Sequence, residues 1–283
     1  MNIRGSSAVF AVLGDPVTHS LSPAIHNRWI ADANLDAVYV ALRIARNDAA
    51  PLIRSLPSAG LSGANVTIPH KEASLLAADW RDDLASRIGA ANTLRFKNGR
   101  IEAFNTDASG FMMALDAATP DWRGDARRAC LLGAGGSARA IVAALDLAGF
   151  SEIAIANRTE TRIKGLTGCA EKARIIPYAW ENRDAAAAGA SLIVNATSLG
   201  LNDVDRFDAP IETAAANAIA FDLVYKPLET QFLKTAAAKG ARAVDGLGML
   251  IYQAAAAFEL WFGIKPNIEN GRAAALAQLT AKP

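Results

Sequence analysis

Short apolar runs alternate with amphipathic segments along this chain. Residues 8–13, 37–44 and 61–66 are rich in apolar and β-branched side chains, which predicts strands. The segment 23–33 predicts a helix, with Ser22 as its N-cap and Pro23 at its first position. Alternation of strands and helices is typical of an α/β fold built on a parallel sheet.

The second half of the chain repeats this alternation. Strands are predicted at 128–132, 152–156, 191–195 and 219–224, and helices at 138–148 and 249–262. A chain of 283 residues is long enough for two domains of moderate size. We therefore predict a second α/β domain after the first.

A glycine-rich loop joins the strand at 128–132 to the helix at 138–148. Its sequence is Gly133-Ala134-Gly135-Gly136-Ser137-Ala138. Glycines allow a tight turn and close approach of the backbone, and a helix N-terminus offers N–H groups, so this arrangement suits a pyrophosphate. The alternative is a plain turn, because glycine clusters are common in turns.

The end of the next predicted strand bears on the choice of dinucleotide. Sites specific for NAD usually place a carboxylate there to bind the ribose 2′-hydroxyl. This chain has Asn157-Arg158-Thr159 instead, with Arg162 one turn later. Two guanidinium groups can bind a 2′-phosphate through charge-assisted hydrogen bonds, which favours NADP over NAD. The alternative is that both arginines are a solvated helix start.

Composition narrows the class of protein. Hydrophobic residues make up 52% of the chain and charged residues 20%, which excludes a disordered protein. The formal net charge of +1 gives no basic surplus for nucleic acid. No apolar run approaches the roughly 20 residues of a membrane helix. Cys130 and Cys169 have no partners at metal-ligand spacing, so we expect no disulfide framework, no metal and a cytoplasmic protein with reduced thiols.

Two hydroxyl side chains stand at the start of the first predicted helix, in His19-Ser20-Leu21-Ser22-Pro23. Hydroxyls at i and i+2 beside a helix N-terminus suit a carboxylate ligand. The alternative is that Ser22 only caps the helix and Ser20 is a loop residue. Local chemistry alone leaves both readings open.

Several short segments stand in one order along nearly the whole chain. They are Gly14-Asp15-Pro16 with His19-Ser20-Leu21-Ser22-Pro23, Asn65-Val66-Thr67-Ile68-Pro69-His70-Lys71, Ala91-Asn92-Thr93, Asn105-Thr106-Asp107, the glycine-rich loop, Asn157-Arg158-Thr159-Glu160-Thr161-Arg162, Asp222-Leu223-Val224-Tyr225, and Asp245-Gly246-Leu247-Gly248-Met249-Leu250 with Gln253. In this order they resemble the motifs of shikimate dehydrogenases. Ala108 and Lys226 depart from the family pattern, but neither belongs to the implied chemistry.

The resemblance implies reduction of 3-dehydroshikimate to shikimate by NADPH, in the biosynthesis of aromatic amino acids through chorismate. Lys71 would be the catalytic acid/base and Asp107 its partner. Reducing a ketone needs a proton for the oxygen, which a lysine beside an aspartate can donate and recover from water. The carboxylate favours the charged ammonium and desolvation disfavours it, and the sequence leaves open which effect prevails.

The other family positions imply ligand contacts. The substrate carboxylate would be bound by Ser20, Ser22 and Tyr225, and the ring hydroxyls by Thr67, Asn92 and Gln253, with Asp107 also touching substrate. NADP would be bound by Gly133, Ala134, Gly135, Gly136, Ser137, Asn157, Arg158, Thr159 and Arg162, by Leu223 and Gly246 near the nicotinamide, and by Asp83, whose motif matches loosely.

Each of these residues has a plainer reading when it is taken singly. Lys71 reads as a solvated surface charge, Asp107 as a helix cap and Asn92 as a turn residue. Tyr225 reads as a half-buried core residue and Gln253 as part of a helix surface. The order of the motifs therefore carries the assignment.

The resemblance also implies how the domains are divided. Residues 1–107 with 245–283 would form an N-terminal α/β substrate-binding domain, and residues 108–244 a Rossmann-type, doubly wound NADP-binding domain. Two rival functions stay open: a quinate/shikimate dehydrogenase with relaxed specificity, and an NADP-binding sensor without catalysis. We expect a small-molecule substrate and neither nucleic acid nor membrane as partner. The oligomeric state is left open, a homodimer included.

Overall fold

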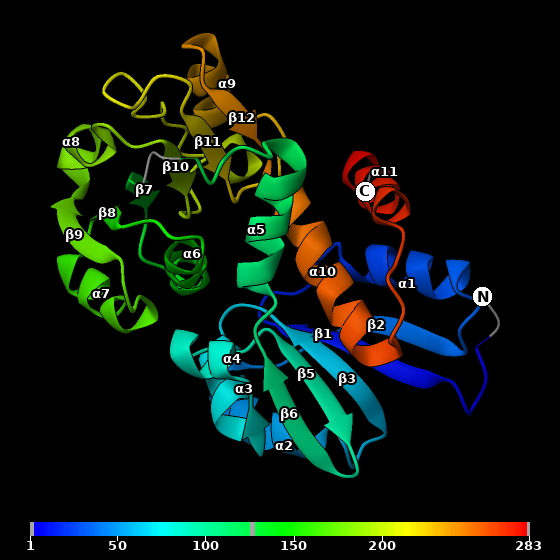
Figure 1. Cartoon of the computed structure of the whole chain (residues 1–283). Helices are drawn as coiled ribbons and strands as arrows, with labels where there is room; N and C mark the ends of the chain where they lie inside the picture. Colours follow the sequence, from blue (N-terminus) through cyan, green and yellow to red (C-terminus); the bar gives the residue numbers. More distant parts are fainter. Residues whose placement is uncertain (1–2, 125–127, 282–283) are drawn as a thin grey trace. The chain divides into compact units, whose positions relative to one another are not determined.

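The structure divides into two compact units. It is a computed structural model that describes residues 3–124 and 128–281. Unit 1 comprises Met1–Thr106 and Ile251–Pro283, and unit 2 comprises Asp107–Leu250. Each unit is built on a six-stranded sheet. Helices pack against each sheet (Figure 1). The predicted α/β fold class is confirmed.

The sheet of unit 1 is mixed, with the strand order β2-β1-β3-β5-β6-β4. Strands β1, β2 and β3 are parallel, β5 runs antiparallel to both β3 and β6, and β4 is parallel to β6. The bounds of these strands are β1 Ala8–Gly14, β2 Ala37–Arg43, β3 Leu61–Val66, β4 Trp80–Arg81, β5 Thr93–Lys97 and β6 Arg100–Phe104. In unit 1 the parallel sheet that the alternation predicted is therefore interrupted by one strand, β5, which runs against the other five.

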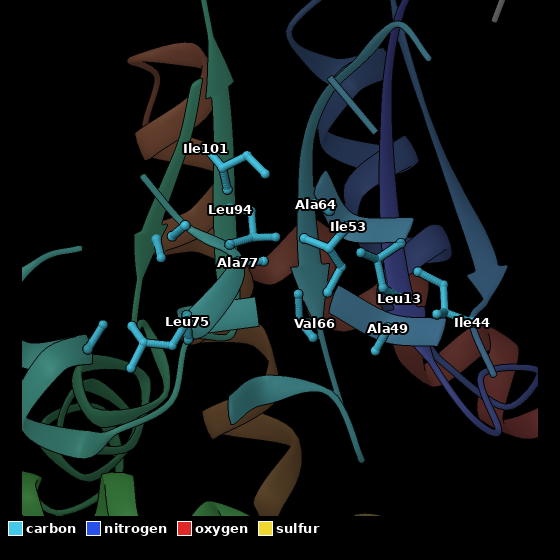
Figure 2. Packing of buried hydrophobic residues seen from close by; sticks show 14 of the residues in the cluster. Leu13, Ile44, Ala49, Ile53, Ala64, Val66, Leu75, Ala77, Leu94 and Ile101 are labelled. Atoms are coloured by element: carbon cyan, nitrogen blue, oxygen red, sulfur yellow. The ribbon is translucent and has the colours of Figure 1, made fainter. Parts of the chain in front are cut away.

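Helices cover both faces of the unit 1 sheet. They are α1 Ser22–Asp32, α2 Ala49–Ser55 after the 3-10 turn Arg46–Asp48, α3 Lys71–Ala77, α4 Asp83–Ile88, α11 Ile268–Thr280, and the part of α10 (Gly246–Phe262) from Ile251 onwards. On one face, Figure 2 shows Ile53 of α2 and Leu75 of α3 among buried side chains of the sheet such as Leu13 and Val66. On the other face, Phe10 of β1 packs against Trp261 of α10, with ring centroids 4.9 Å apart.

The sheet of unit 2 is entirely parallel and has the strand order β12-β11-β10-β7-β8-β9. The chain starts at the centre, runs outward through β8 and β9, then returns and runs outward on the other side. This doubly wound order places a topological switch point between β7 and β10, where α/β proteins bind ligands at the strand ends. The bounds are β7 Arg128–Leu132, β8 Glu152–Asn157, β9 Arg174–Ala179, β10 Leu192–Asn195, β11 Ile219–Asp222 and β12 Arg242–Val244.

The helices of unit 2 pack against this sheet. They are α5 Asp107–Ala118, α6 Gly136–Leu147, α7 Glu160–Lys164, α8 Arg183–Ala187, α9 Gln231–Ala238 and the start of α10, with 3-10 turns at Thr167–Cys169, Trp180–Asn182 and Leu201–Asp203. Phe111 of α5 lies against Phe221 of β11, with ring centroids 4.9 Å apart. In the part of the chain that the structure describes, no helix has both the length and the apolar character needed to cross a bilayer.

Some element boundaries differ from the prediction. Helix α6 begins at Gly136 rather than 138, and α10 begins at Gly246 rather than 249. Strand β11 ends at Asp222, because the Asp222 carboxylate accepts a hydrogen bond from the Val224 N–H and turns the chain there. The hairpin β5–β6 was not predicted, although Asn98-Gly99 is a strong turn signal and both residues have positive φ, 53° and 74°.

His26 of α1 is a titratable side chain in the core of unit 1. It is fully buried and stacks on the ring of Tyr39, with centroids 4.2 Å apart and planes 6° from parallel. Burial lowers the pKa of His26 to about 3, because the imidazolium form is poorly solvated there. The unfolded chain therefore binds a proton near pH 6.5 that the folded chain does not bind until about pH 3.

We expect His26 to make the folded state less stable in acid. Stability is lost as the pH falls below 6.5, by roughly 1.4 kcal/mol for each pH unit. Between pH 7 and pH 5.5 the wild type should lose about 1 kcal/mol more than His26→Phe, in free energies of unfolding from urea titrations. If the two proteins lose stability in parallel, His26 is not the source of the acid sensitivity.

Candidate active site

In unit 1 the predicted site residues converge on one edge of the sheet. Strand β6 is parallel to β1 and β3, so the carboxyl ends of all three strands meet at this edge. The segments that follow β1 and β3 are hydrogen-bonded to each other, since Thr67 N–H donates to Leu13 O at 2.8 Å and Asp15 N–H to Ile68 O at 3.0 Å. The topology therefore gathers motifs that lie far apart in the sequence.

Ser20 and Ser22 follow β1 at this edge. Ser22 is the first residue of α1, and the cap is Leu21, with no side-chain capping bond. The prediction that Ser22 is the N-cap is wrong, because its own N–H donates to the Ser20 hydroxyl at 3.3 Å. As an acceptor of that bond, Ser20 Oγ keeps its proton for another partner. The structure thus removes the simple capping reading of this pair.

Lys71 is the first residue of α3 and is partly exposed, directly after the segment that begins at Thr67. Its carbonyl oxygen accepts from Ala91 N–H at 2.9 Å and from the Ser74 hydroxyl at 2.8 Å. The preceding residue, His70, is buried and bonds Ile44 O through Nε2 at 2.7 Å. These bonds fix the Lys71 backbone next to the segment that carries Asn92.

Asn92 is the centre of a buried hydrogen-bond network. Its Oδ1 accepts from Thr106 N–H at 2.7 Å, and since a backbone N–H can only donate, this bond fixes the orientation of the amide. Asn92 Nδ2 then donates to Thr106 Oγ1 at 2.9 Å and to Gln253 Oε1 at 3.0 Å. Both Asn92 and Gln253 are buried, at 2% and 8% exposure. The prediction that Gln253 belongs to a helix surface is therefore wrong, whereas Asn92 does lie in a bend, with its side chain buried.

Two residues beside this network had no predicted role. Asn65 Nδ2 donates to Asn92 O at 3.3 Å and to Thr93 Oγ1 at 3.1 Å, so Asn65 Oδ1 accepts from the Tyr39 hydroxyl at 2.7 Å. Burial raises the pKa of Tyr39 well above its usual value, while a hydrogen bond from Ser22 lowers it in part. Tyr39 thus links the serine pair to the Asn92 network. A tyrosine inside an apolar strand is too common a pattern to have revealed this.

In unit 2 the glycine-rich loop lies at the switch point between β7 and β10. Gly133 has φ 101°, and a Cβ there would lie 2.8 Å from Thr197 Cγ2 and 3.1 Å from the Ala196 backbone. Only glycine fits this close approach of the two loops. Gly135 is the N-cap of the 12-residue helix α6 and makes no side-chain capping bond. Ala134 and Ser137 are partly exposed, and Gly135 and Gly136 are exposed.

Asn157 connects the glycine-rich loop to the arginine segment. Its Oδ1 accepts from Ala134 N–H at 3.2 Å, and its Nδ2 donates to Thr159 O at 2.8 Å. Thr159 is the N-cap of α7, and the side chains of Arg158 and Arg162 are exposed beside it. The structure therefore gives Asn157 a role in holding the two segments together and leaves both guanidinium groups accessible to an anion.

The remaining predicted site residues lie in unit 2, except Asp83, which lies in unit 1. Gly246 lies against the backbone of Leu223, since a Cβ on Gly246 would be 2.4 Å from Leu223 O. Tyr225 is partly buried, and burial raises the pKa of its phenol. Asp107 is the first residue of α5, and Asp83 is an exposed residue at the start of α4 in unit 1, whereas the other cofactor candidates lie in unit 2. Over the described ranges, no group of three or more His, Cys, Asp or Glu side chains is placed to hold a metal ion.

Comparison with known proteins decides the family. The chain is 44% identical over 261 residues to the shikimate dehydrogenase (NADP(+)) of Paracoccus denitrificans, covering 92% of each sequence. The chain belongs to the shikimate dehydrogenase family. Family models match residues 12–94 as "Shikimate dehydrogenase substrate binding domain", 115–206 as "Shikimate / quinate 5-dehydrogenase" and 246–276 as "Shikimate 5'-dehydrogenase C-terminal domain".

Solved structures of this family have the same fold. Shikimate 5-dehydrogenase from Thermus thermophilus, in complex with NADP(H) and shikimate, is 39% identical and superposes with a TM-score of 0.85 over 96% of this chain and 99% of that one. Quinate dehydrogenase from Corynebacterium glutamicum, in complex with NAD, is 27% identical with a TM-score of 0.86, over 96% and 99%. Solved structures with this fold thus include complexes with NADP(H) and with NAD.

Proposed function

We propose that this chain catalyses the reversible, NADPH-dependent reduction of 3-dehydroshikimate to shikimate, a step in aromatic amino-acid biosynthesis through chorismate. The observation that carries the proposal is one edge of the unit 1 sheet. Ser20 and Ser22 follow β1 there, Thr67 and Lys71 follow β3, and Asn92 directly precedes the antiparallel strand β5. A small hydroxylated carboxylic acid offers an anion for hydroxyl donors and ring hydroxyls for amides. This edge supplies both kinds of group beside one ammonium.

Lys71 is the proposed acid/base. In the reducing direction its ammonium gives a proton to the carbonyl oxygen that becomes the new hydroxyl, and in the reverse direction the neutral amine takes that proton back. We assign Asp107 as the carboxylate that stabilises the ammonium form and also touches the substrate. The main-chain bonds of Lys71 to Ala91 and Ser74 support this role, because a proton donor must be held at a fixed position.

Substrate recognition is proposed to use two sets of groups. Ser20, Ser22 and Tyr225 bind the carboxylate through their hydroxyl groups, and the Ser22 hydroxyl turns its proton from Tyr39 to the carboxylate when the substrate binds. Thr67, Asn92 and Gln253 bind the ring hydroxyls. The fixed orientation of the Asn92 amide supports this, since Gln253 accepts from it through Oε1 and the orientation of the Gln253 amide is thereby fixed as well.

NADP supplies or accepts the hydride when it is bound. The residues of unit 2 fit such a dinucleotide, because the uncapped N-terminus of α6 offers backbone N–H groups to a pyrophosphate and a Cβ on Gly135 or Gly136 would meet nothing within 4 Å. Gly133, Ala134 and Ser137 complete the loop, and Asn157 with Thr159 positions Arg158 and Arg162 toward a 2′-phosphate. Leu223 and Gly246 are proposed to contact the nicotinamide, and Asp83 is proposed as a minor cofactor contact.

These assignments give each unit one ligand. We propose that unit 1 is the substrate-binding domain and unit 2 the NADP-binding domain. Cys130 and Cys169 are buried thiols and form no disulfide within the described residues, which supports a reducing, cytoplasmic location. A homodimer is the assembly we would test first, by light scattering of the purified protein.

Initial rates with four substrate pairs test the function. Shikimate and quinate are each oxidised with NADP⁺ and with NAD⁺, and reduced nicotinamide is followed by absorbance. We expect a strong signal with shikimate and NADP⁺ alone. Comparable rates with quinate or NAD⁺ would indicate an enzyme of relaxed specificity. Cofactor binding without turnover in any pair would indicate a sensor.

A further inference from the structure

Asp222, the last residue of β11, carries a carboxylate that is completely buried. Its Oδ1 accepts from Asn195 Nδ2 at 2.8 Å and from Val224 N–H at 2.9 Å, and its Oδ2 accepts from the Thr230 hydroxyl at 2.6 Å. All three donors are neutral groups. Burial raises the pKa of Asp222 to about 6, while the three hydrogen bonds lower it in part. Burying a carboxylate among neutral donors costs desolvation free energy that an apolar side chain at the same position would not cost.

The donors come from separate elements of unit 2. Asn195 ends β10, and its carbonyl oxygen also accepts from Leu223 N–H at 2.9 Å. Thr230 is the N-cap of α9, where its hydroxyl oxygen accepts from Leu233 N–H at 3.3 Å. The carboxylate therefore ties β10, β11 and the start of α9 to the turn that begins at Asp222.

The backbone of the same turn also packs closely against Gly246. A Cβ at that position would lie 2.4 Å from Leu223 O and 2.6 Å from Asp222 O, so the backbone of residues 222–223 touches the start of α10. Leu223 is fixed on both sides as a result. Tyr225 follows one residue after the Val224 N–H that Asp222 binds.

We propose that Asp222 is a positioning residue that fixes the turn 222–225, so that Leu223 meets the nicotinamide and Tyr225 meets the substrate carboxylate. The inference rests on the proposed function, which supplies the roles of those two residues. The turn carries a contact for each ligand, so a displacement of its backbone would disturb cofactor and substrate together. A neutral asparagine can replace two of the three bonds through Oδ1, and Thr230 can accept from its Nδ2, because a hydroxyl can reverse its role.

The test compares Asp222→Ala with Asp222→Asn. The alanine variant leaves the Val224 N–H and the Thr230 hydroxyl without an acceptor and leaves Asn195 Nδ2 only its bond to Leu199 O. We expect kcat/KM for shikimate to fall about tenfold. The asparagine variant should stay within about threefold of wild type, because it retains most of the bonds. Binding of adenosine 2′,5′-bisphosphate, which contains only the adenosine end of NADP, should be unchanged in both, since residues 222–225 are proposed to contact the other end.

Asp146→Ala is the matched control. Asp146 is also a buried carboxylate of unit 2, and it accepts from the N–H groups of Lys172 at 2.8 Å and Ala173 at 2.6 Å, away from the turn. It should lower the melting temperature without changing kcat/KM. If Asp222→Ala does not fold, Thr230→Ala removes one of the donors and should lower kcat/KM about threefold, with bisphosphate binding unchanged.

Three results would overturn the role of Asp222. The first is a wild-type kcat/KM in Asp222→Ala or, where that variant does not fold, in Thr230→Ala. The second is a loss of bisphosphate affinity equal to the loss of kcat/KM. The third is an Asp222→Asn variant that is as impaired as Asp222→Ala. Failure of the proposed function is a separate outcome. It would appear as a wild-type protein that does not oxidise shikimate with NADP⁺ at all.

Discussion

Lys71→Ala is expected to lower kcat for shikimate oxidation by roughly 10²–10⁴-fold, the usual contribution of a positioned general acid/base. The hydroxyl proton of shikimate must leave as the carbonyl forms, and in the variant the lysine amine that takes it is missing. The affinity for shikimate should stay broadly intact, because hydroxyl and amide groups bind the carboxylate and ring. Steady-state rates give kcat, and equilibrium titration gives the dissociation constant of shikimate.

The control is Lys97→Ala, which removes an exposed ammonium at the end of β5 in the same unit. That variant should have wild-type kinetics, so a general effect of charge on the enzyme would show there. Turnover close to normal in Lys71→Ala would eliminate the lysine mechanism. A large loss of shikimate affinity with little change in kcat would instead make Lys71 a binding residue.

The part of this fold that the sequence predicts best depends on local pattern. The strand at 128–132, the glycine-rich loop and the helix after it lie next to one another in the chain, and the structure has them as β7, Gly133 to Gly135 and α6. The motif Asn157-Arg158-Thr159 likewise begins at the last residue of β8. Each of these features follows from a few consecutive residues, so apolar runs and glycine spacing suffice to find them.

The part that the sequence does not predict depends on contacts between distant residues. Asn92 and Gln253 are 161 positions apart, and nothing near either residue reveals that their amides are bonded. The same holds for Asn195 and Asp222, where each side chain reads locally as a polar residue that ends a strand. Helix capping at Ser22 was wrong because the N-cap of α1 is Leu21, which makes no side-chain capping bond, and the local sequence does not reveal this.

Arg158 and Arg162 are the residues from which we expect the largest effect on the choice of cofactor. Arg158→Gln with Arg162→Gln should lower kcat/KM for NADP⁺ about a hundredfold, since each charge-assisted hydrogen bond to the 2′-phosphate accounts for about tenfold. With NAD⁺, which has no 2′-phosphate, the rate should hardly change. The measured quantity is the ratio of kcat/KM for NADP⁺ to that for NAD⁺, in wild type and in the double variant.

Both guanidinium groups are exposed, so the dependence of NADP⁺ binding on salt is a second and independent test of whether Arg158 and Arg162 bind the 2′-phosphate. Added salt screens exposed charges, and it should weaken NADP⁺ binding by the wild type more than NADP⁺ binding by the double variant. Arg206→Gln removes an exposed arginine that is paired with Asp203 in the same unit, and it should leave the ratio unchanged. An equal loss for NADP⁺ and NAD⁺ in the double variant would mean that the arginines hold the loop or the shared part of the dinucleotide. In that case the preference for NADP would have to come from Asn157 and Thr159, which Asn157→Ala could then examine.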